Sequence, residues 1–162
     1  MPDSESALKC ELAAEVLRSF GTLRFAATGW SMLPSVWPGE TLVVERADPD
    51  RVHIGDLLLV AREGRLCAHR VVGTAGDPGN RQWITQGDAQ PIPDPPVGES
   101  QLLGRVTYLI RAGRLVAVPG QLSLVENLVA KVVRRSLLAA RTLVYLNRVR
   151  QSSEESVLPC QG

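Results

Sequence analysis

The sequence predicts a mainly β protein of the α+β class, in which a coiled antiparallel β domain carries an N-terminal helix and a C-terminal helical extension. Between residues 23 and 118, short apolar or β-branched runs alternate with turn residues. Residues 5–20 and 121–150 instead repeat apolar side chains at helical spacing. We therefore divide the chain into residues 1–22, the β domain 23–118, the basic amphipathic extension 119–150 and a flexible tail 151–162.

The N-terminal helix is predicted from apolar side chains that recur every three or four residues. They are Leu8, Leu12, Val16, Leu17 and Phe20. Gly21 follows them and is a suitable residue to end a helix. We expect this helix to pack on the β domain through these side chains.

Five runs of the central segment are expected to form strands. They are Thr41–Val44, Leu57–Val60, Leu66–Val72, Trp83–Thr85 and Gly104–Ile110, separated by turns such as Pro38-Gly39, Glu63-Gly64 and Ala112-Gly113. Several short strands with tight turns favour a compact, coiled β domain. Pro91–Pro96 holds four prolines in six residues, which excludes a central strand and predicts an extended loop.

The segment 121–150 is strongly basic, with six Lys or Arg residues and one acid, Glu126. Such a helix could lie on an anionic membrane, dock on a partner, or pack on its own domain with a solvated basic face. Over the whole chain the net charge is only +1, and no basic run lies among the tryptophans. Nucleic-acid binding is therefore not expected.

The N-terminus, the longest uncharged run and the cysteines indicate where in the cell the protein is expected to lie. The N-terminus is acidic and no apolar core of a signal peptide follows it. The longest uncharged run, Phe25–Gly39, has 15 residues with two prolines and two glycines, whereas a membrane span needs about 20 apolar residues. Three widely spaced cysteines are typical of free thiols in a reducing compartment. These features predict a cytoplasmic or peripheral membrane protein.

A nucleophile, a base and two acids follow one another in the β domain. Ser31 precedes His69 by 38 positions, and Asp88 and Asp94 come after the Trp83–Thr85 run. A serine hydroxyl needs a base, and histidine can exchange a proton near neutral pH. Lys9 and Lys131 fall in the predicted helices, so the spacing favours His69.

An acid that orients the histidine would complete the arrangement. Asp88 and Asp94 are both candidates, and either could instead be a structural carboxylate of a turn. Arg70 should point to the face opposite His69 and form an ion pair, with an acid of the Gly55-Asp56 turn as the expected partner. Cys67 and His69 alone make a poor zinc signal, so neither a metal nor a cofactor is expected.

Residues 25–108 resemble the type I signal peptidase superfamily, which includes the LexA-like self-cleaving regulators. The matching segments are Gly29-x-Ser31-Met32-x-Pro34, Pro38–Leu42 with Ile54–Leu58, His69–Val72, Gly87-Asp88 with Asp94, and Gly104–Val106. His69 stands where bacterial signal peptidases carry lysine, so the chain is most similar to the archaeal and endoplasmic-reticulum branch. The resemblance implies Asp94 as the triad aspartate and Asp88 as a second partner or the alternative orienting acid.

The chain departs from that pattern beside the nucleophile. Signal peptidases usually carry a serine two residues before it, whose hydroxyl helps to bind the oxyanion, and here that position is Gly29. Thr28 is the nearest hydroxyl, and the backbone N–H of Ser31 remains as a donor. The resemblance also implies that Met32 lines the substrate cleft.

These observations predict a serine endopeptidase of signal-peptidase type, acting on a peptide or precursor protein with small residues before the cut. Without a membrane anchor it would act at a membrane surface through residues 121–150, or process small precursors in solution. One alternative is a self-cleaving regulator, although residues 1–30 contain no Ala-Gly or Cys-Gly bond. Another is a peptide-binding module that keeps the fold without turnover.

Overall fold

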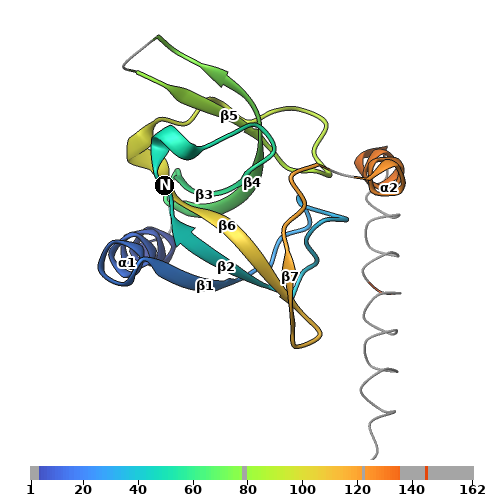
Figure 1. Cartoon of the computed structure of the whole chain (residues 1–162), viewed down its shortest axis with the longest axis horizontal. Helices are drawn as coiled ribbons and strands as arrows, with labels where there is room; N and C mark the ends of the chain where they lie inside the picture. Colours follow the sequence, from blue (N-terminus) through green and yellow to red (C-terminus); the bar gives the residue numbers. More distant parts are fainter. Residues whose placement is uncertain (1–3, 78–79, 122, 136–144, 146–162) are drawn as a thin grey trace, which may run out of the picture.

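The computed structural model describes residues 4–77, 80–121, 123–135 and 145 of the chain. It is mainly an antiparallel β sheet with an N-terminal helix and a short C-terminal helix, as the sequence predicts (Figure 1). The helices are α1 (Ser4–Phe20) and α2 (Leu124–Arg135), with 3₁₀ turns η1 (Pro49–Arg51) and η2 (Glu99–Gln101). The strands are β1 (Thr22–Ala26), β2 (Thr41–Arg46), β3 (Leu57–Arg62), β4 (Arg65–Ala75), β5 (Gln82–Gln86), β6 (Leu102–Arg111) and β7 (Arg114–Ala117).

The strands form one sheet in the order β1-β2-β6-β3-β4-β5, with β7 added to β6. The register shifts by a residue between Val43 and Val44, Leu59 and Val60, and Val71 and Gly73. Such bulges increase the local twist and bend a strand. The sheet therefore curls, and β3, β4 and β5 turn away from the β1-β2 end (Figure 1).

Strand β3 lies in the middle of the sheet and is buried on both faces. Leu57 and Leu59 belong to one apolar cluster with Leu17 of α1, while Leu58 and Val60 belong to a second cluster around Trp83. Side chains alternate between the faces of a strand, so one uninterrupted apolar run supplies both clusters. This run holds β4, and with it His69, in a rigid position.

Helix α1 covers the predicted residues but buries a different face from the one expected. Its buried side chains are Cys10, Ala13 and Leu17, whereas Leu8 and Leu12 are 63% and 61% exposed. Small side chains allow a helix to approach a sheet closely, which explains why Cys10 and Ala13 face inward. Of the predicted apolar set, only Leu17 is fully buried.

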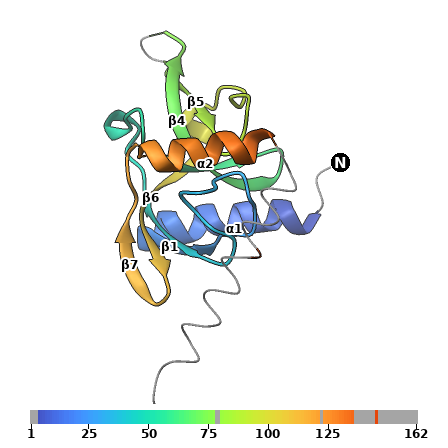
Figure 2. The same ribbon diagram turned by 90° about the vertical axis from the view of Figure 1, so that its right-hand side faces the viewer.

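Helix α2 begins with a reciprocal cap, in which the backbone N–H of Ser123 donates to Glu126 and that of Glu126 donates to the Ser123 hydroxyl. Its buried Val133 packs with Leu33 of the loop between β1 and β2 (Figure 2). The rest of the predicted extension, and the tail 151–162, lie outside the described residues. Among the described residues, no helix is long and apolar enough to cross a membrane.

Candidate active site

Ser31 lies in the loop that joins β1 to β2. Backbone hydrogen bonds from Leu33 to Trp30 and from Val36 to Met32 fold this loop into tight turns. Met32 and Leu33 are buried beneath it and anchor it to the apolar core and to α2. Ser31 itself is only partly buried, so its hydroxyl is held by a rigid loop at an accessible position.

A second segment holds the Ser31 backbone from the opposite side. The backbone N–H of Ala89 donates to the Ser31 carbonyl at 2.8 Å. A Cβ at Gly87 would lie 2.6 Å from that carbonyl oxygen and 2.9 Å from the Ser31 Cβ. Because these distances are shorter than any real Cβ contact, the close approach of the two segments requires glycine at position 87.

His69, on β4, contacts both Ser31 and Asp94. Its Nε2 lies 2.9 Å from the Ser31 hydroxyl and its Nδ1 lies 2.6 Å from Oδ2 of Asp94. A carboxylate can only accept a hydrogen bond, so Nδ1 carries the proton of the neutral ring. Nε2 is then left to accept the hydrogen of the Ser31 hydroxyl.

Asp94 lies in the proline-rich loop, which runs beside β5 without being a strand. The backbone N–H of Asp94 donates to the Thr85 carbonyl at 2.7 Å, and Trp83 and Val97 exchange two backbone hydrogen bonds further along. The prolines around Asp94 have no N–H to extend this pairing. They nevertheless do not displace Asp94, because the backbone is attached to β5 at Asp94 itself and again at Val97.

Two further side chains hold the Asp94 carboxylate. The Thr85 hydroxyl donates to Oδ2 at 2.8 Å, and Nη1 of Arg62 lies 3.0 Å from Oδ1. Arg62 also donates to the Pro95 carbonyl at 2.8 Å. Neither Arg62 nor Thr85 was predicted as a site residue, since neither spacing nor motif connects the end of β3 or the middle of β5 with Asp94.

Asp88, the other candidate acid, lies elsewhere. It forms a bidentate ion pair with Arg70, in which both N–H···O distances are 2.9 Å, and it accepts a hydrogen bond from the Ser35 hydroxyl. Both nitrogens of the His69 ring are already engaged, so Asp88 does not orient that ring. Arg70 thus forms the predicted structural ion pair, but the expected partner in the Gly55-Asp56 turn is wrong, since that turn contributes only the Gly55 carbonyl.

This buried pair supports the nucleophile loop. Arg70 also donates to Ser35 and to the carbonyl of Pro119, which precedes α2. A single guanidinium therefore connects β4, the segment after β5, the Ser31 loop and the approach to α2. Burial of such a charge is tolerated only because its donors find partners of this kind.

The predicted oxyanion and cleft residues lie together with Ser31. Thr28, Gly29 and Met32 line a cavity of about 160 Å³ beside Ser31 and His69. No hydrogen bond involves the Ser31 N–H within the described part of the chain, so this donor remains available. Thr28 is exposed, and a Cβ at Gly29 would meet no atom within 4 Å.

The remaining wall of the cavity is largely apolar. It includes Phe25, Val36, Leu42, Leu66 and Ala68. Cys67 also lines it, and burial raises the pKa of this thiol above its usual value.

The other side chains that could act as a base lie in different elements. Lys9 pairs with Glu5 on α1, and His53 is exposed in the loop before β3.

No protein-family model matches the chain, and no curated protein resembles it in sequence.

Proposed function

We propose that the chain is a serine endopeptidase of signal-peptidase type, which cleaves a peptide or precursor protein through an acyl-enzyme on Ser31. One observation carries the proposal. The imidazole of His69 lies 2.9 Å from the Ser31 hydroxyl on one side and 2.6 Å from the Asp94 carboxylate on the other. These three groups, at these distances, have the relationship that nucleophilic acyl transfer requires.

The chemistry follows from the positions of the protons. His69 takes the hydroxyl proton of Ser31 at Nε2 as the oxygen attacks the peptide carbonyl, and Asp94 stabilises the imidazolium that forms. His69 then returns the proton to the departing amine, which leaves an ester on Ser31. Water, activated by the same imidazole, hydrolyses the ester. General base catalysis of this kind contributes about 10²–10⁴ in rate.

The negative charge on the attacked oxygen needs donors. The free N–H of Ser31 is the backbone donor in this role. Gly29 provides no side-chain donor, and Thr28 is the nearest hydroxyl in sequence. Because one missing donor costs about 10²–10³ in rate, we expect turnover to be slower than in a site with two donors.

A substrate strand has a place to bind. The pairing of β4 with β5 begins at Arg70, whereas residues 65–69 of β4 pair, among the described residues, only with β3. Within the same residues, strand β1 pairs only with β2, and the segment that follows it, with Ala27 and Thr28, forms the opposite wall of the cavity. An extended peptide can add to such a free edge, with its carbonyl near Ser31. The cavity of about 160 Å³ favours a small apolar side chain before the cut.

The coiled sheet and the order of the motifs support a fold of signal peptidase/LexA-like type, in the histidine-using branch. A membrane-associated role in signal peptide processing is part of this proposal. Val125, Leu128 and Val132 of α2 are exposed, and Lys131 lies among them. An apolar stripe with basic neighbours suits a peripheral contact with an anionic membrane through residues 121–150.

A fluorophosphonate probe tests the proposal. We expect it to label Ser31 of the wild type, to leave Ser31→Ala unlabelled, and to react much more slowly with His69→Ala. A peptide library then gives the cleavage preference. A folded wild type that neither reacts nor cleaves, yet binds peptides, would identify a binding module instead. Two fragments of this chain after incubation, seen by intact mass, would identify self-cleavage.

A further inference from the structure

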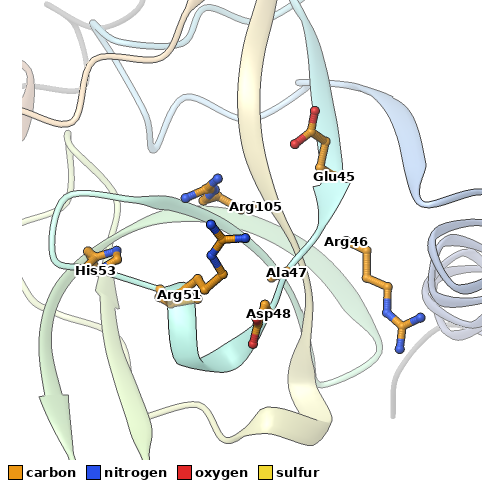
Figure 3. Close-up of a pocket in the computed structure, with 8 residues that line it drawn as sticks. Glu45, Arg46, Ala47, Asp48, Arg51, His53 and Arg105 are labelled. Carbon is orange, nitrogen blue, oxygen red and sulfur yellow. The ribbon is translucent and has the colours of Figure 1, made fainter.

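A second cavity, of about 330 Å³, opens where β2 leads into η1 (Figure 3). Its wall is formed by Glu45 to Asp48, Arg51 to His53, and Arg105. None of these residues lines the cavity beside Ser31. Its volume lies within the range of small-molecule sites, about 300–1,000 Å³. The proposed peptidase chemistry makes no use of it.

Basic side chains outnumber their acidic partners in this cavity. The Arg51 side chain points across it toward Arg105, and His53 lies on the same side (Figure 3). Arg105 and His53 share one carboxylate, that of Asp56, at 3.8 and 4.0 Å. Within the described residues, Arg51 has no ion pair or hydrogen bond of its side chain. The three basic side chains Arg51, His53 and Arg105 are therefore accompanied by one carboxylate that pairs with them, that of Asp56.

Neither acid in the wall forms an ion pair with Arg51 or Arg105 in the described part of the chain. The Asp48 carboxylate accepts the backbone N–H of Asp50 and caps η1. Glu45 stands opposite Arg105 in the β2–β6 register. No ion pair joins Glu45 to Arg105 in the described part of the chain. Arg51 and Arg105 repel one another, and the contact of Arg105 with Asp56 at 3.8 Å offsets this only in part, so an anion between the two guanidinium groups would relieve the repulsion.

We propose that this cavity binds a phosphate group. Guanidinium groups present rigid pairs of N–H donors that match phosphate oxygens, and charge-assisted bonds of this kind are the stronger ones. The ring N–H of His53 offers a further donor from the same side. Arg51 is exposed and forms no ion pair or side-chain hydrogen bond in the part of the chain that the structure describes, so it can turn toward a ligand without breaking such a bond. The remaining volume accommodates the group to which the phosphate is attached.

Calorimetric titration of the full chain with inorganic phosphate and with pyrophosphate tests the proposal. Low salt is needed because exposed charges are screened. We expect saturable binding, weakened about tenfold in Arg51→Gln and in Arg105→Gln. The matched control is Arg46→Gln, because Arg46 borders the same cavity and loses the same charge but points away from it (Figure 3). Its affinity should stay within about twofold of the wild type.

Two results would overturn the proposal: no Arg51-dependent binding of phosphate, pyrophosphate or phosphatidic acid vesicles, or equal weakening by Arg46→Gln and Arg51→Gln. Arg51→Gln should not disturb folding, since the Arg51 side chain is exposed and forms no ion pair or hydrogen bond with the described residues. Vesicles with and without phosphatidic acid distinguish a lipid headgroup from a free phosphoester. Arg51-dependent binding only to the anionic vesicles indicates the lipid, and equal binding of soluble phosphate indicates the free ligand. Ser31→Ala should bind phosphate normally, so this result is independent of the peptidase proposal.

Discussion

Arg62 forms an ion pair with Asp94, with 3.0 Å between Nη1 and Oδ1, while the other carboxylate oxygen contacts His69. The side chains of Arg62 and Asp94 are only 16% and 12% exposed, so water screens the pair weakly. Arg62 comes from the end of β3 and also holds the Pro95 carbonyl. It therefore determines where the proline-rich loop presents its carboxylate.

Arg62→Gln should lower kcat about tenfold and leave KM nearly unchanged, because it acts on the orientation of Asp94 and not on the substrate. Arg62→Lys, which keeps the charge, should recover part of the loss. Steady-state kinetics on a cleaved peptide measures both. A change in KM alone, or no rescue by lysine together with a lower melting temperature, would argue for a purely structural role.

The two aspartates should separate activity from stability. Asp94→Asn removes the acceptor that fixes the Nδ1 proton of His69, so kcat should fall about 10³–10⁴-fold with little change in melting temperature. Asp88→Asn weakens the buried pair with Arg70 and should destabilise the fold by about 3 kcal/mol. Kinetics and thermal unfolding of the two variants check this. The opposite assignment of the two effects would move the orienting role to Asp88.

His69→Ala should abolish turnover and leave the fold largely intact, since only the Ser31 hydroxyl and the Asp94 carboxylate lose a hydrogen-bond partner. Peptide cleavage and circular dichroism measure the two properties. Near-normal cleavage by a folded His69→Ala protein would exclude this residue as the base. Fluorophosphonate labelling of the same sample gives an independent measure of Ser31 reactivity.

The two glycines beside Ser31 should differ in how substitution by alanine affects activity. Gly87→Ala places a Cβ 2.6 Å from the Ser31 carbonyl oxygen, so the nucleophile must move and kcat should fall about 10²-fold. Gly29→Ala meets nothing within 4 Å and is the matched control, with activity near the wild type. Gly29→Ser should raise kcat about tenfold by adding an oxyanion donor. A loss of activity in Gly29→Ala would show that the room for a Cβ at these positions does not explain the effect of the substitutions.

Cys67 should react slowly at neutral pH. Burial raises the pKa of its thiol, so at a given pH less of the reactive thiolate is present than in an exposed cysteine. Alkylation by iodoacetamide should be slower than that of glutathione at pH 7 and accelerate as the pH rises toward the raised pKa. Peptide mapping by mass identifies the modified cysteine.

The same reaction should report on the cavity beside Ser31. An alkyl group on Cys67 occupies part of that cavity, so peptide cleavage should stop as modification proceeds. Cys67→Ser should remain active after the same treatment. Alkylation at the rate of glutathione, or modification without loss of cleavage, would contradict the position assigned to this side chain.

The sequence by itself determined the fold class and most of the elements. The apolar run at Leu57–Val60 predicts a strand that needs cover on both faces, and Glu63-Gly64 predicts the hairpin turn where both residues have positive φ. Strands β1 and β7 were not identified individually, because they are short and carry no residue that is fully buried. They are strands because β1 pairs with β2 and β7 pairs with β6 in the folded sheet.

The sequence also determined which residue types were available for the site, but only the tertiary structure decided how they combine. Asp88 and Asp94 both follow the Trp83–Thr85 run, and only the family resemblance, not their spacing, favours Asp94. The attachment of the proline-rich loop to β5 brings Asp94 to His69, while Arg70 captures Asp88. Arg62 and Thr85 join the site for the same reason, because backbone pairing between segments far apart in the chain, which no local pattern encodes, sets which side chains meet.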